Sequence, residues 1–313
     1  MSTKRWIAII AAAVLLGVSV VLNSLFAVFQ SGLGTGVDEL LATADTAYSE
    51  YVIEEGNANE RIAVLSVDGI IQDTGTGGSL FGGAGYNHQF FMEQLEQVKE
   101  DGTIQAVVLK VNTPGGGVIE SAQIYDKITE IQEETGKPFY VAMGGMAASG
   151  GYYISAPAEK IFVHRETLTG SIGVIMESIN YAELADNLGI DFVTIQSGEY
   201  KDIMSPTREM RDDERMMLED MLNDSYESFV DIIVEGREMM TEEEVREVAD
   251  GRIMNGRQAV EANLADDFGY EEDVVEALKE DFDMANPEVF EYGMSGGFGS
   301  MFGLKMNSFF GNS

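Results

Sequence analysis

The strongest constraint on the fold is an alternation of apolar runs and amphipathic segments that begins near residue 61. Residues 61–71 (RIAVLSVDGII), 105–111 (QAVVLKV) and 138–143 are short and apolar, which predicts buried strands. The stretches 90–99 and 117–135 between them have the apolar spacing of helices. Because strands separated by helices of this length are joined by crossovers, the pattern predicts an α/β fold with a largely parallel sheet.

The alternation continues in shorter elements towards the C-terminus. It predicts three more strands, over 160–164, 171–176 and 191–196, and one helix, over 181–188. The segment 208–250 is expected to be helical, because an apolar stripe at helical spacing runs along it. Thr241 and Glu244 form a capping box, which predicts that a second helix begins there.

The N-terminus contains an apolar run long enough to cross a membrane. Lys4 and Arg5 precede residues 6–29, which as a helix would measure about 36 Å against about 30 Å of hydrocarbon. The alternative is a cleaved signal peptide, but the run is longer than the usual apolar region and no small-residue cleavage site comes after it. Because basic residues favour the cytoplasmic side, we expect a single-pass protein of the cell membrane. Its N-terminus would be cytoplasmic and the rest of the chain extracytoplasmic.

Charge and composition argue against several classes of function. The chain has 54 acidic against 19 basic residues, a net charge of −35, so a nucleic-acid backbone would be repelled. It has no cysteine, which excludes thiol nucleophiles, disulfides and zinc sites with thiolate ligands. His88 and His164 are the only histidines, and neither has a neighbour that suggests a catalytic triad.

Three segments carry residues that could perform chemistry. Residues 112–117 (NTPGGG) lie between a strand and a helix, where backbone N–H groups would suit a developing oxyanion, although an ordinary turn is equally consistent. Ser149, in 144–151 (GGMAASGG), is accessible to a peptide among small residues, but serine is also a common helix N-cap. Lys201, in 197–206, comes after a predicted strand and a glycine turn. Taken alone, it is more readily explained as a surface lysine in an ion pair.

A serine nucleophile needs a base, and histidine is scarce in this chain. A lysine can take that role when burial lowers its pKa towards neutrality and hydrogen bonds hold its neutral form. Lys201 is therefore a candidate base only if the folded protein desolvates it.

Together, these segments resemble the signal peptide peptidase A family in its short bacterial form. The likeness runs from about residue 61 to about residue 278, and the motifs occur in the family's order. The matching stretches are 111–117 (VNTPGGG), 143–153 (MGGMAASGGYY), 168–174 (LTGSIGV), 201–206 (KDIMSP) and 250–259 (DGRIMNGRQA). The resemblance implies a membrane-anchored serine protease with a ClpP/crotonase-like fold of ββα units, preceded by one transmembrane helix.

The resemblance also implies a role for each of five residues. Ser149 would be the nucleophile, Lys201 the general base, and Ser171 the hydroxyl that orients the lysine. Gly116 and Gly150 would supply the backbone N–H groups of the oxyanion hole. Such a mechanism needs no metal and no cofactor.

The resemblance implies substrates and an assembly as well. The partners would be the membrane and remnant signal peptides or other extended apolar peptides. A ring- or dome-shaped homo-oligomer would enclose the sites, and each site could draw residues from a neighbouring subunit. Five segments are expected: a cytoplasmic N-terminus (1–5), a transmembrane anchor (6–29), a membrane-proximal spacer (30–59), a protease domain (60–285) and a flexible tail (286–313).

Three other functions share part of this evidence. A related membrane protease that cuts membrane proteins would use the same residues, and substrate profiling with signal peptides would separate the two. An acyl-CoA enzyme of the crotonase type would need neither Ser149 nor Lys201, and an acidic surface suits the CoA phosphates badly. A non-catalytic membrane scaffold of the same fold would have no use for the set of Ser149, Lys201 and Ser171.

Overall fold

The computed structural model describes residues 48–74 and 86–294. Residues 51–292 form one compact unit. The segment 6–29, expected to be a membrane anchor, lies outside the described residues. Within those residues, no helix combines the length and apolarity needed to span a bilayer.

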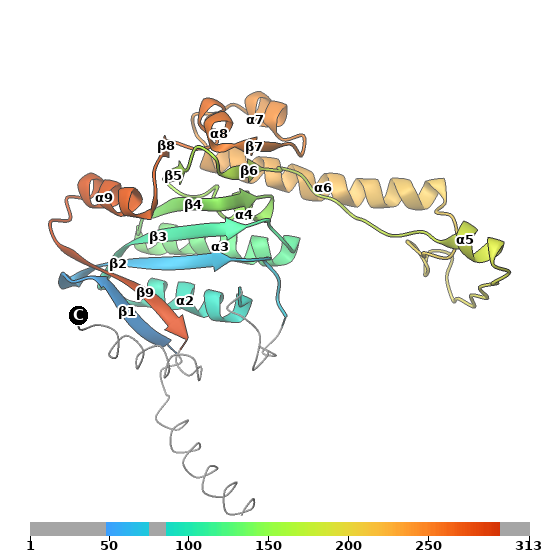
Figure 1. Ribbon diagram of the computed structural model, residues 1–313, viewed down its shortest axis with the longest axis horizontal. Coiled ribbons are helices and arrows are strands. Elements are labelled where there is room, and N and C mark those ends of the chain that lie inside the picture. Colours follow the sequence, from blue (N-terminus) through green and yellow to red (C-terminus); the bar gives the residue numbers. More distant parts are fainter. Residues whose placement is uncertain (1–47, 75–85, 295–313) are drawn as a thin grey trace, which may run out of the picture. The chain divides into compact units, whose positions relative to one another are not determined.

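The unit is built on a nine-stranded sheet in which seven strands have the order β1-β9-β2-β3-β4-β5-β8, with β6 beside β4 and β7 beside β6 (Figure 1). The strands are β1 (Tyr48–Glu54), β2 (Asn57–Asp68), β3 (Ile104–Thr113), β4 (Phe139–Ala148), β5 (Lys160–Val163), β6 (Leu168–Gly170), β7 (Ile253–Asn255), β8 (Asp267–Phe268) and β9 (Pro287–Met294). The described helices are α2 (His88–Glu100), α3 (Val118–Thr135), α4 (Gly150–Tyr153), α5 (Ala182–Asn187), α6 (Asp212–Gly236), α7 (Glu242–Val248), α8 (Gly256–Glu261) and α9 (Glu271–Asp281).

The central strands pair in parallel, which confirms the α/β prediction. The pairs β2–β3, β3–β4 and β4–β5 are all parallel, whereas β6 and β7 pair antiparallel. Side chains alternate across the sheet. Ala63, Leu65 and Val67 of β2 join the apolar cluster that includes α2 and α3. Ile62 and Val64 join the cluster on the other face, which α9 covers. Both faces of the central sheet are therefore buried.

The sheet extends beyond the segment 60–285 at both ends. β1 occupies part of the expected spacer, and β9 occupies the first residues of the expected tail. β9 inserts between β1 and β2, where Val289 and Phe290 pair with Ile62 and Ala63. The C-terminal strand is thus part of the core sheet, since Phe290 is fully buried.

Two predicted strands are absent from the described chain. Residues 171–176 and 191–196 form no strand, and most of these side chains face solvent. Ile175 is 85% exposed and Ile195 is 95% exposed. The β-branched pattern of both segments finds no partner strand in this chain, so these two predictions are wrong for the single chain.

Residues 174–224, which we call the arm, comprise α5, the turns on either side of it and the first half of α6. In Figure 1, α6 runs away from the sheet, and α5 lies at the end of α6 that is distant from α4. The second half of α6 packs on the rest of the unit, where Phe229 contacts the Tyr153 ring at 4.9 Å between centroids. The first half leaves Met216, Met217 and Met221 exposed. We call the rest of the described unit, outside residues 174–224, the sheet layers. The arm is therefore joined to the sheet layers mainly through one end of α6.

Candidate active site

Ser149 occupies a sharp turn between a strand and a helix. β4 ends at Ala148 and α4 begins at Gly150, so Ser149 is the N-cap of α4. Its φ of 54° and ψ of −118° are unusual for a residue with a side chain and store backbone strain. The surrounding bonds fix this conformation: the Ser149 N–H donates to the Gly170 carbonyl at 2.8 Å, and its carbonyl accepts from two N–H groups of α4. The Oγ makes no capping bond, so the hydroxyl is available for other chemistry.

The glycine turn after β3 packs directly against Ser149. Gly115 has a φ of +99°, and a Cβ at this position would lie 2.9 Å from the Ser149 Cβ and 2.7 Å from the Gly150 nitrogen. A Cβ on Gly150 would lie 3.3 Å from the Gly116 nitrogen. Ile71 holds the turn, since it donates to the Gly115 carbonyl at 3.0 Å and accepts from the Gly117 N–H at 2.8 Å. Only glycine allows the two turns to approach this closely.

This packing brings two unpaired donors to the side of the serine. Among the described residues, the backbone N–H groups of Gly116 and Gly150 have no hydrogen-bond acceptor. Gly150 is the first residue of α4, where N–H groups have no partner within the helix. A pair of such donors beside a hydroxyl can stabilise negative charge that develops on a carbonyl oxygen.

A cavity of about 690 Å³ opens in front of Ser149. Gly116, Gly150 and Ser171 line it with Ser149, and its apolar walls include Tyr153, Ile172, Leu222 and Phe229. The last two come from α6, so the arm and the sheet layers share this cavity. The cavity combines serine hydroxyls and backbone groups with apolar walls, a lining typical of ligand-binding sites.

Ser171 lies directly after β6 and lines the same cavity as Ser149. Its N–H donates to the Arg252 carbonyl at 2.7 Å, and its φ of 52° is again in the left-handed region. The antiparallel pair of β6 with β7 therefore fixes the Ser171 backbone, as the β4–α4 turn fixes Ser149.

Lys201 is the one expected residue that does not line the cavity. It lies in the segment that joins α5 to α6, and α5 lies at the end of α6 that is distant from α4 (Figure 1). Its side chain is exposed, and within the described residues its ammonium has no ion pair or hydrogen bond. The single chain therefore brings together Ser149, Ser171 and the two glycines and leaves Lys201 apart from them.

One polar group at the site was not anticipated from the sequence. The Ser121 hydroxyl, in the first turn of α3, is 2% exposed and has no hydrogen-bond partner among the described residues. It lines the cavity, and a Cβ on Gly150 would lie 2.5 Å from its Oγ. No sequence signal separates it from an ordinary serine near a helix start, because its burial depends on how the two glycine turns pack.

The histidines and the acidic residues offer no alternative centre. His88 is buried between the Tyr86 hydroxyl at 2.6 Å and the Gln123 side chain at 2.8 Å, and neither histidine lines the cavity. Across residues 48–74 and 86–294, no group of three or more His, Asp or Glu side chains is arranged to hold a metal ion.

Comparison with known proteins connects this geometry to one family. Residues 131–285, which include Ser149, Ser171 and Lys201, match the sequence profile of peptidase family S49. A protein of Enterococcus faecium named as a signal peptide peptidase SppA is 40% identical over 296 residues, which cover 93% of this chain and 85% of that protein. A protein of Methanocaldococcus jannaschii named as a protease is 36% identical over 78% of each chain. Protease 4 of Salmonella typhi is 30% identical over 73% of this chain and 36% of its own length.

Proposed function

Because this chain belongs to peptidase family S49 and is a protease of the SppA type, we propose that it is a membrane-anchored serine endopeptidase that degrades remnant signal peptides. Ser149 is the nucleophile and Lys201 the general base. The observation that carries the proposal is the strained Ser149 turn, whose uncommitted hydroxyl lies beside two unpaired backbone N–H groups at a cavity. The ClpP/crotonase-like fold belongs to the same proposal, and the mixed α/β sheet supports it.

The chemistry is acyl transfer. Neutral Lys201 accepts the proton of the Ser149 hydroxyl while the Oγ forms a bond to the peptide carbonyl carbon and the carbonyl oxygen becomes an oxyanion. The N–H groups of Gly116 and Gly150 donate to this oxyanion, each worth about 3 kcal/mol in comparable sites. When the intermediate collapses, the C–N bond breaks and the Lys201 ammonium gives its proton to the leaving amine. Water then attacks the acyl ester while Lys201 takes its proton; the bond between the acyl carbon and the Ser149 Oγ breaks, and the Lys201 ammonium returns the proton to the Oγ.

Lys201 reaches this site from a second copy of the chain. In the single chain it lies on the arm and outside the Ser149 cavity, while Ser171 already lines the cavity and can hydrogen-bond to an incoming amine. The exposed apolar residues of the arm, such as Ile195, need a partner surface. In a ring or dome of copies, the next subunit covers the apolar residues of each arm, and the arm places its Lys201 at the Ser149 cavity of that subunit.

The cavity supports an extended apolar substrate. Its walls include Tyr153, Leu222 and Phe229, and the sites enclosed by a ring exclude folded proteins. An anchor over residues 6–29 with a cytoplasmic N-terminus places the catalytic domain outside the cytoplasm, beside the membrane in which signal peptides remain.

The test is hydrolysis of a synthetic apolar signal peptide by the full chain in detergent micelles. Ser149→Ala and Lys201→Ala should each lower the rate on the order of a thousandfold or more, while circular dichroism and assembly stay unchanged. Mixing the two inactive variants before assembly should restore activity in about one quarter of the sites, because half of the sites keep the serine and half keep the lysine.

Each outcome separates the alternatives. If wild type assembles but never cuts the peptide and is not labelled by a serine-acylating inhibitor, the scaffold function replaces the protease. If Lys201→Ala cuts normally, the dyad is wrong. If wild type cuts a membrane protein and leaves isolated signal peptides intact, the substrate class is wrong and the chemistry stands.

A further inference from the structure

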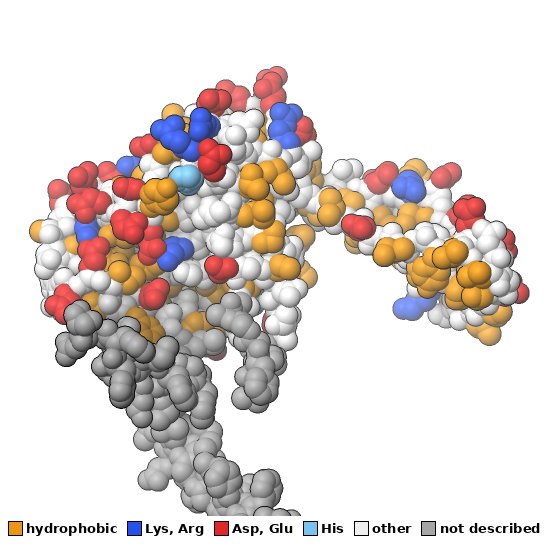
Figure 2. Space-filling view, viewed as in Figure 1, with side chains coloured by type: hydrophobic (Ala, Val, Ile, Leu, Met, Phe, Trp, Pro, Cys, Tyr) orange, Lys and Arg blue, Asp and Glu red, His pale blue; other side chains and the backbone are white. Residues whose placement is uncertain are grey.

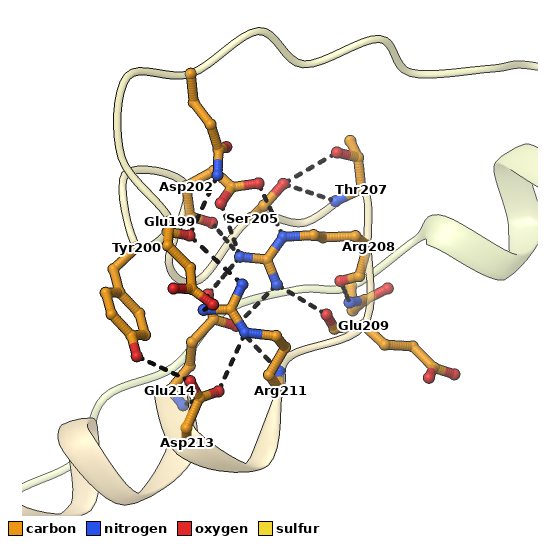
Figure 3. Close-up of polar contacts among 12 residues, drawn as sticks. Glu199, Tyr200, Asp202, Ser205, Thr207, Arg208, Glu209, Arg211, Asp213 and Glu214 are labelled. Atoms are coloured by element: carbon orange, nitrogen blue, oxygen red, sulfur yellow. Dashed lines mark hydrogen bonds and ion pairs between the residues drawn. The ribbon is translucent and has the colours of Figure 1, made fainter.

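The turn that carries Lys201 is tied to the first turn of α6 on both sides of the lysine (Figure 3). On one side, the Tyr200 hydroxyl donates to the Asp213 carboxylate at 3.0 Å. On the other side, Arg208 binds both oxygens of the Asp202 carboxylate, each at 2.8 Å. Both sequence neighbours of Lys201 are therefore held, and the lysine lies between them.

Arg208 binds a second carboxylate at the same time. Its Nη1 and Nη2 donate to the two oxygens of Glu214 at 2.8 and 2.5 Å (Figure 3). The Glu214 side chain is fully buried, and it also accepts the backbone N–H of Arg211 at 3.0 Å. The Arg208 guanidinium thus joins the turn of Lys201 to α6 through two paired, charge-assisted contacts. A lysine at position 208 could not reproduce them.

Backbone contacts make this turn compact. The Lys201 N–H donates to the Gly198 carbonyl at 3.2 Å, and the Ser205 N–H donates to the Asp202 carbonyl at 2.9 Å. Arg208 also donates to the Asp202 carbonyl at 3.2 Å. The backbone of Lys201 is thus fixed, whereas its ammonium has no partner within the described residues.

In so acidic a chain, a general-base lysine must be kept from pairing with nearby carboxylates. It must lose its proton before it can accept one from the serine, and a carboxylate close to the amine favours the protonated form. Asp202 is the adjacent residue in the sequence, and Glu214 is buried close to the same arginine. A carboxylate of this turn that is left without a partner would favour the protonated lysine.

We propose that Arg208 is a positioning residue for Lys201, because it fixes the lysine's turn on α6 and engages Asp202 and Glu214 so that neither binds the amine. The inference rests on the proposed function, in which Lys201 is the base. The arginine adds one fixed positive charge beside two carboxylates and occupies their oxygens, so that neither is free to pair with the lysine.

Among the other charged groups around the turn, Asp213 and Arg211 are paired with each other, whereas the exposed Glu209 carboxylate has no ion pair within the described residues. Asp213 is bound by Tyr200 and by Arg211 at 3.1 Å, and Arg211 also lies 3.9 Å from Glu199. The segment 178–181 packs on the turn through three uncharged side chains or backbone groups, those of Ser178, Asn180 and Tyr181. In the cavity that the lysine would enter, the acidic residues are Glu219 and Asp250, and Arg252 binds Asp250.

The same contacts favour the ionised form of both carboxylates. Hydrogen bonds from Arg208 lower the pKa of Asp202 to about 2. Hydrogen bonds from Arg208 and the Arg211 backbone lower the pKa of Glu214 as well. Both carboxylates are therefore ionised at any pH at which a lysine could be neutral, and both are engaged by the arginine.

The experiment compares pH profiles of kcat/KM for signal-peptide hydrolysis, using the full assembled chain. In Arg208→Gln, the freed Asp202 should move the acid limb of the profile upward by about one pH unit, equal to about a tenfold loss well below the limb. Arg208→Lys should move it less, because it keeps the charge without the paired contacts. Arg246→Gln is the matched control, since Arg246 also binds two carboxylates, Glu227 and Glu242, away from the cavity.

A double variant isolates the cause. Adding Asp202→Asn to Arg208→Gln removes the freed carboxylate and should return the acid limb to near its wild-type position, even if kcat stays lower. An unmoved limb in Arg208→Gln, or no return in the double variant, would overturn the inference. If Arg208→Gln does not assemble, the limb of Arg208→Lys decides in the same way.

The controls keep this test separate from the proposed function. Wild type must be active and Lys201→Ala inactive for the proposed function to stand. If both hold while the limb does not move, only the role of Arg208 fails.

Discussion

The sheet layers and the arm are stabilised by different interactions, although both contain many apolar residues. In the sheet layers, strand residues such as Leu65, Leu109 and Val141 are fully buried between helices. In the arm, Ile175, Val193 and Ile195 are 85%, 86% and 95% exposed, and ion pairs around Arg208 join its turn to α6. The sheet layers therefore satisfy their apolar pattern within one chain. The arm leaves its apolar pattern exposed in the single chain, as the proposed contact with a second copy requires.

The space-filling view makes the contrast visible. In Figure 2, apolar side chains gather over the end of the arm around α5 and continue along α6. Monomeric soluble proteins rarely expose apolar surface this continuously. Because the arm also carries Lys201, the assembly that we propose would have one neighbouring subunit both cover the arm and receive its lysine.

The largest expected effect comes from spoiling the arm's apolar surface. Val193→Asp combined with Ile195→Asp should prevent assembly and lower peptide hydrolysis at least about a hundredfold, because Lys201 would no longer reach a serine. The thermal transition of the sheet layers should stay in place, since neither residue packs on them. Analytical ultracentrifugation in detergent and the peptide assay measure both effects.

Met239→Asp is the matched control, because Met239 is 80% exposed but lies outside the arm. It should leave both assembly and activity intact. Native assembly and activity in the double-aspartate variant would show that the arm is not an interface. The exposure of its apolar residues would then have no role in assembly or catalysis.

A second prediction compares one truncation in each region. Leu109→Ala removes a fully buried side chain between Leu65 and Val141 of the neighbouring strands and should cost about 2–5 kcal/mol of unfolding free energy. Ile195→Ala should cost less than about 0.5 kcal/mol when the chain is kept monomeric by dilution. Urea unfolding followed by circular dichroism gives both values. Equal costs would mean that the arm is packed in the single chain after all.

The sequence predicts the sheet layers far better than the arm, and the reason is physical. Strands such as 105–111 alternate with helices that cover them, so the apolar pattern and the burial occur in the same chain. Residues 191–196 show the same β-branched pattern, but periodicity reports only that a residue prefers burial and not what will bury it.

The candidate site divides in the same way. The glycine turns and Ser149 are predictable from local motifs that place a strand end beside a helix start, and the structure brings Gly116, Gly150 and Ser171 to the same cavity. The separation of Lys201 from that cavity depends on the direction of α6, which no local pattern determines. The insertion of β9 between β1 and β2 depends likewise on a long-range pairing.

A third prediction concerns pH and the ion pairs of the arm. Arg208 lowers the pKa of Asp202 from its ordinary value to about 2, so the carboxylate binds fewer protons in the folded than in the unfolded state. The stabilisation is therefore complete above an unfolded pKa of about 3.9 and is lost as the pH falls through about 2. Hydrogen exchange, corrected for the intrinsic rate, should show that 198–214 loses protection on acidification before β3 does.

Arg208→Gln supplies the control for that measurement. Its turn should already exchange faster at pH 5 and should change little on acidification, because the pairs that titrate are absent. If the wild-type turn and β3 lose protection together, the ion pairs do not hold the arm separately from the sheet layers.

The smallest expected effect tests whether the buried hydroxyl groups of the sheet layers all have hydrogen-bond partners in the single chain. Ser121 in α3 and Ser155 just after α4 are both buried. The Ser155 hydroxyl donates to the Gly151 carbonyl at 2.7 Å, whereas the Ser121 Oγ has no partner among the described residues. A buried hydroxyl without a partner destabilises a fold by about 1 kcal/mol or more. Ser121→Ala should therefore stabilise the chain by about 1 kcal/mol, whereas Ser155→Ala should destabilise it by about the same amount.

Thermal unfolding of the full chain in detergent measures the pair of variants, and the sign is the informative result. If Ser121→Ala destabilises as Ser155→Ala does, the hydroxyl has a partner in solution, such as a bound water in the cavity. If it stabilises, the Ser121 hydroxyl is unsatisfied within the described chain, like the Gly116 and Gly150 N–H groups beside it, at the place where a peptide carbonyl would bind. The Ser121 hydroxyl would then gain a hydrogen-bond partner only from a bound molecule, as the exposed residues of the arm would be buried only by another chain.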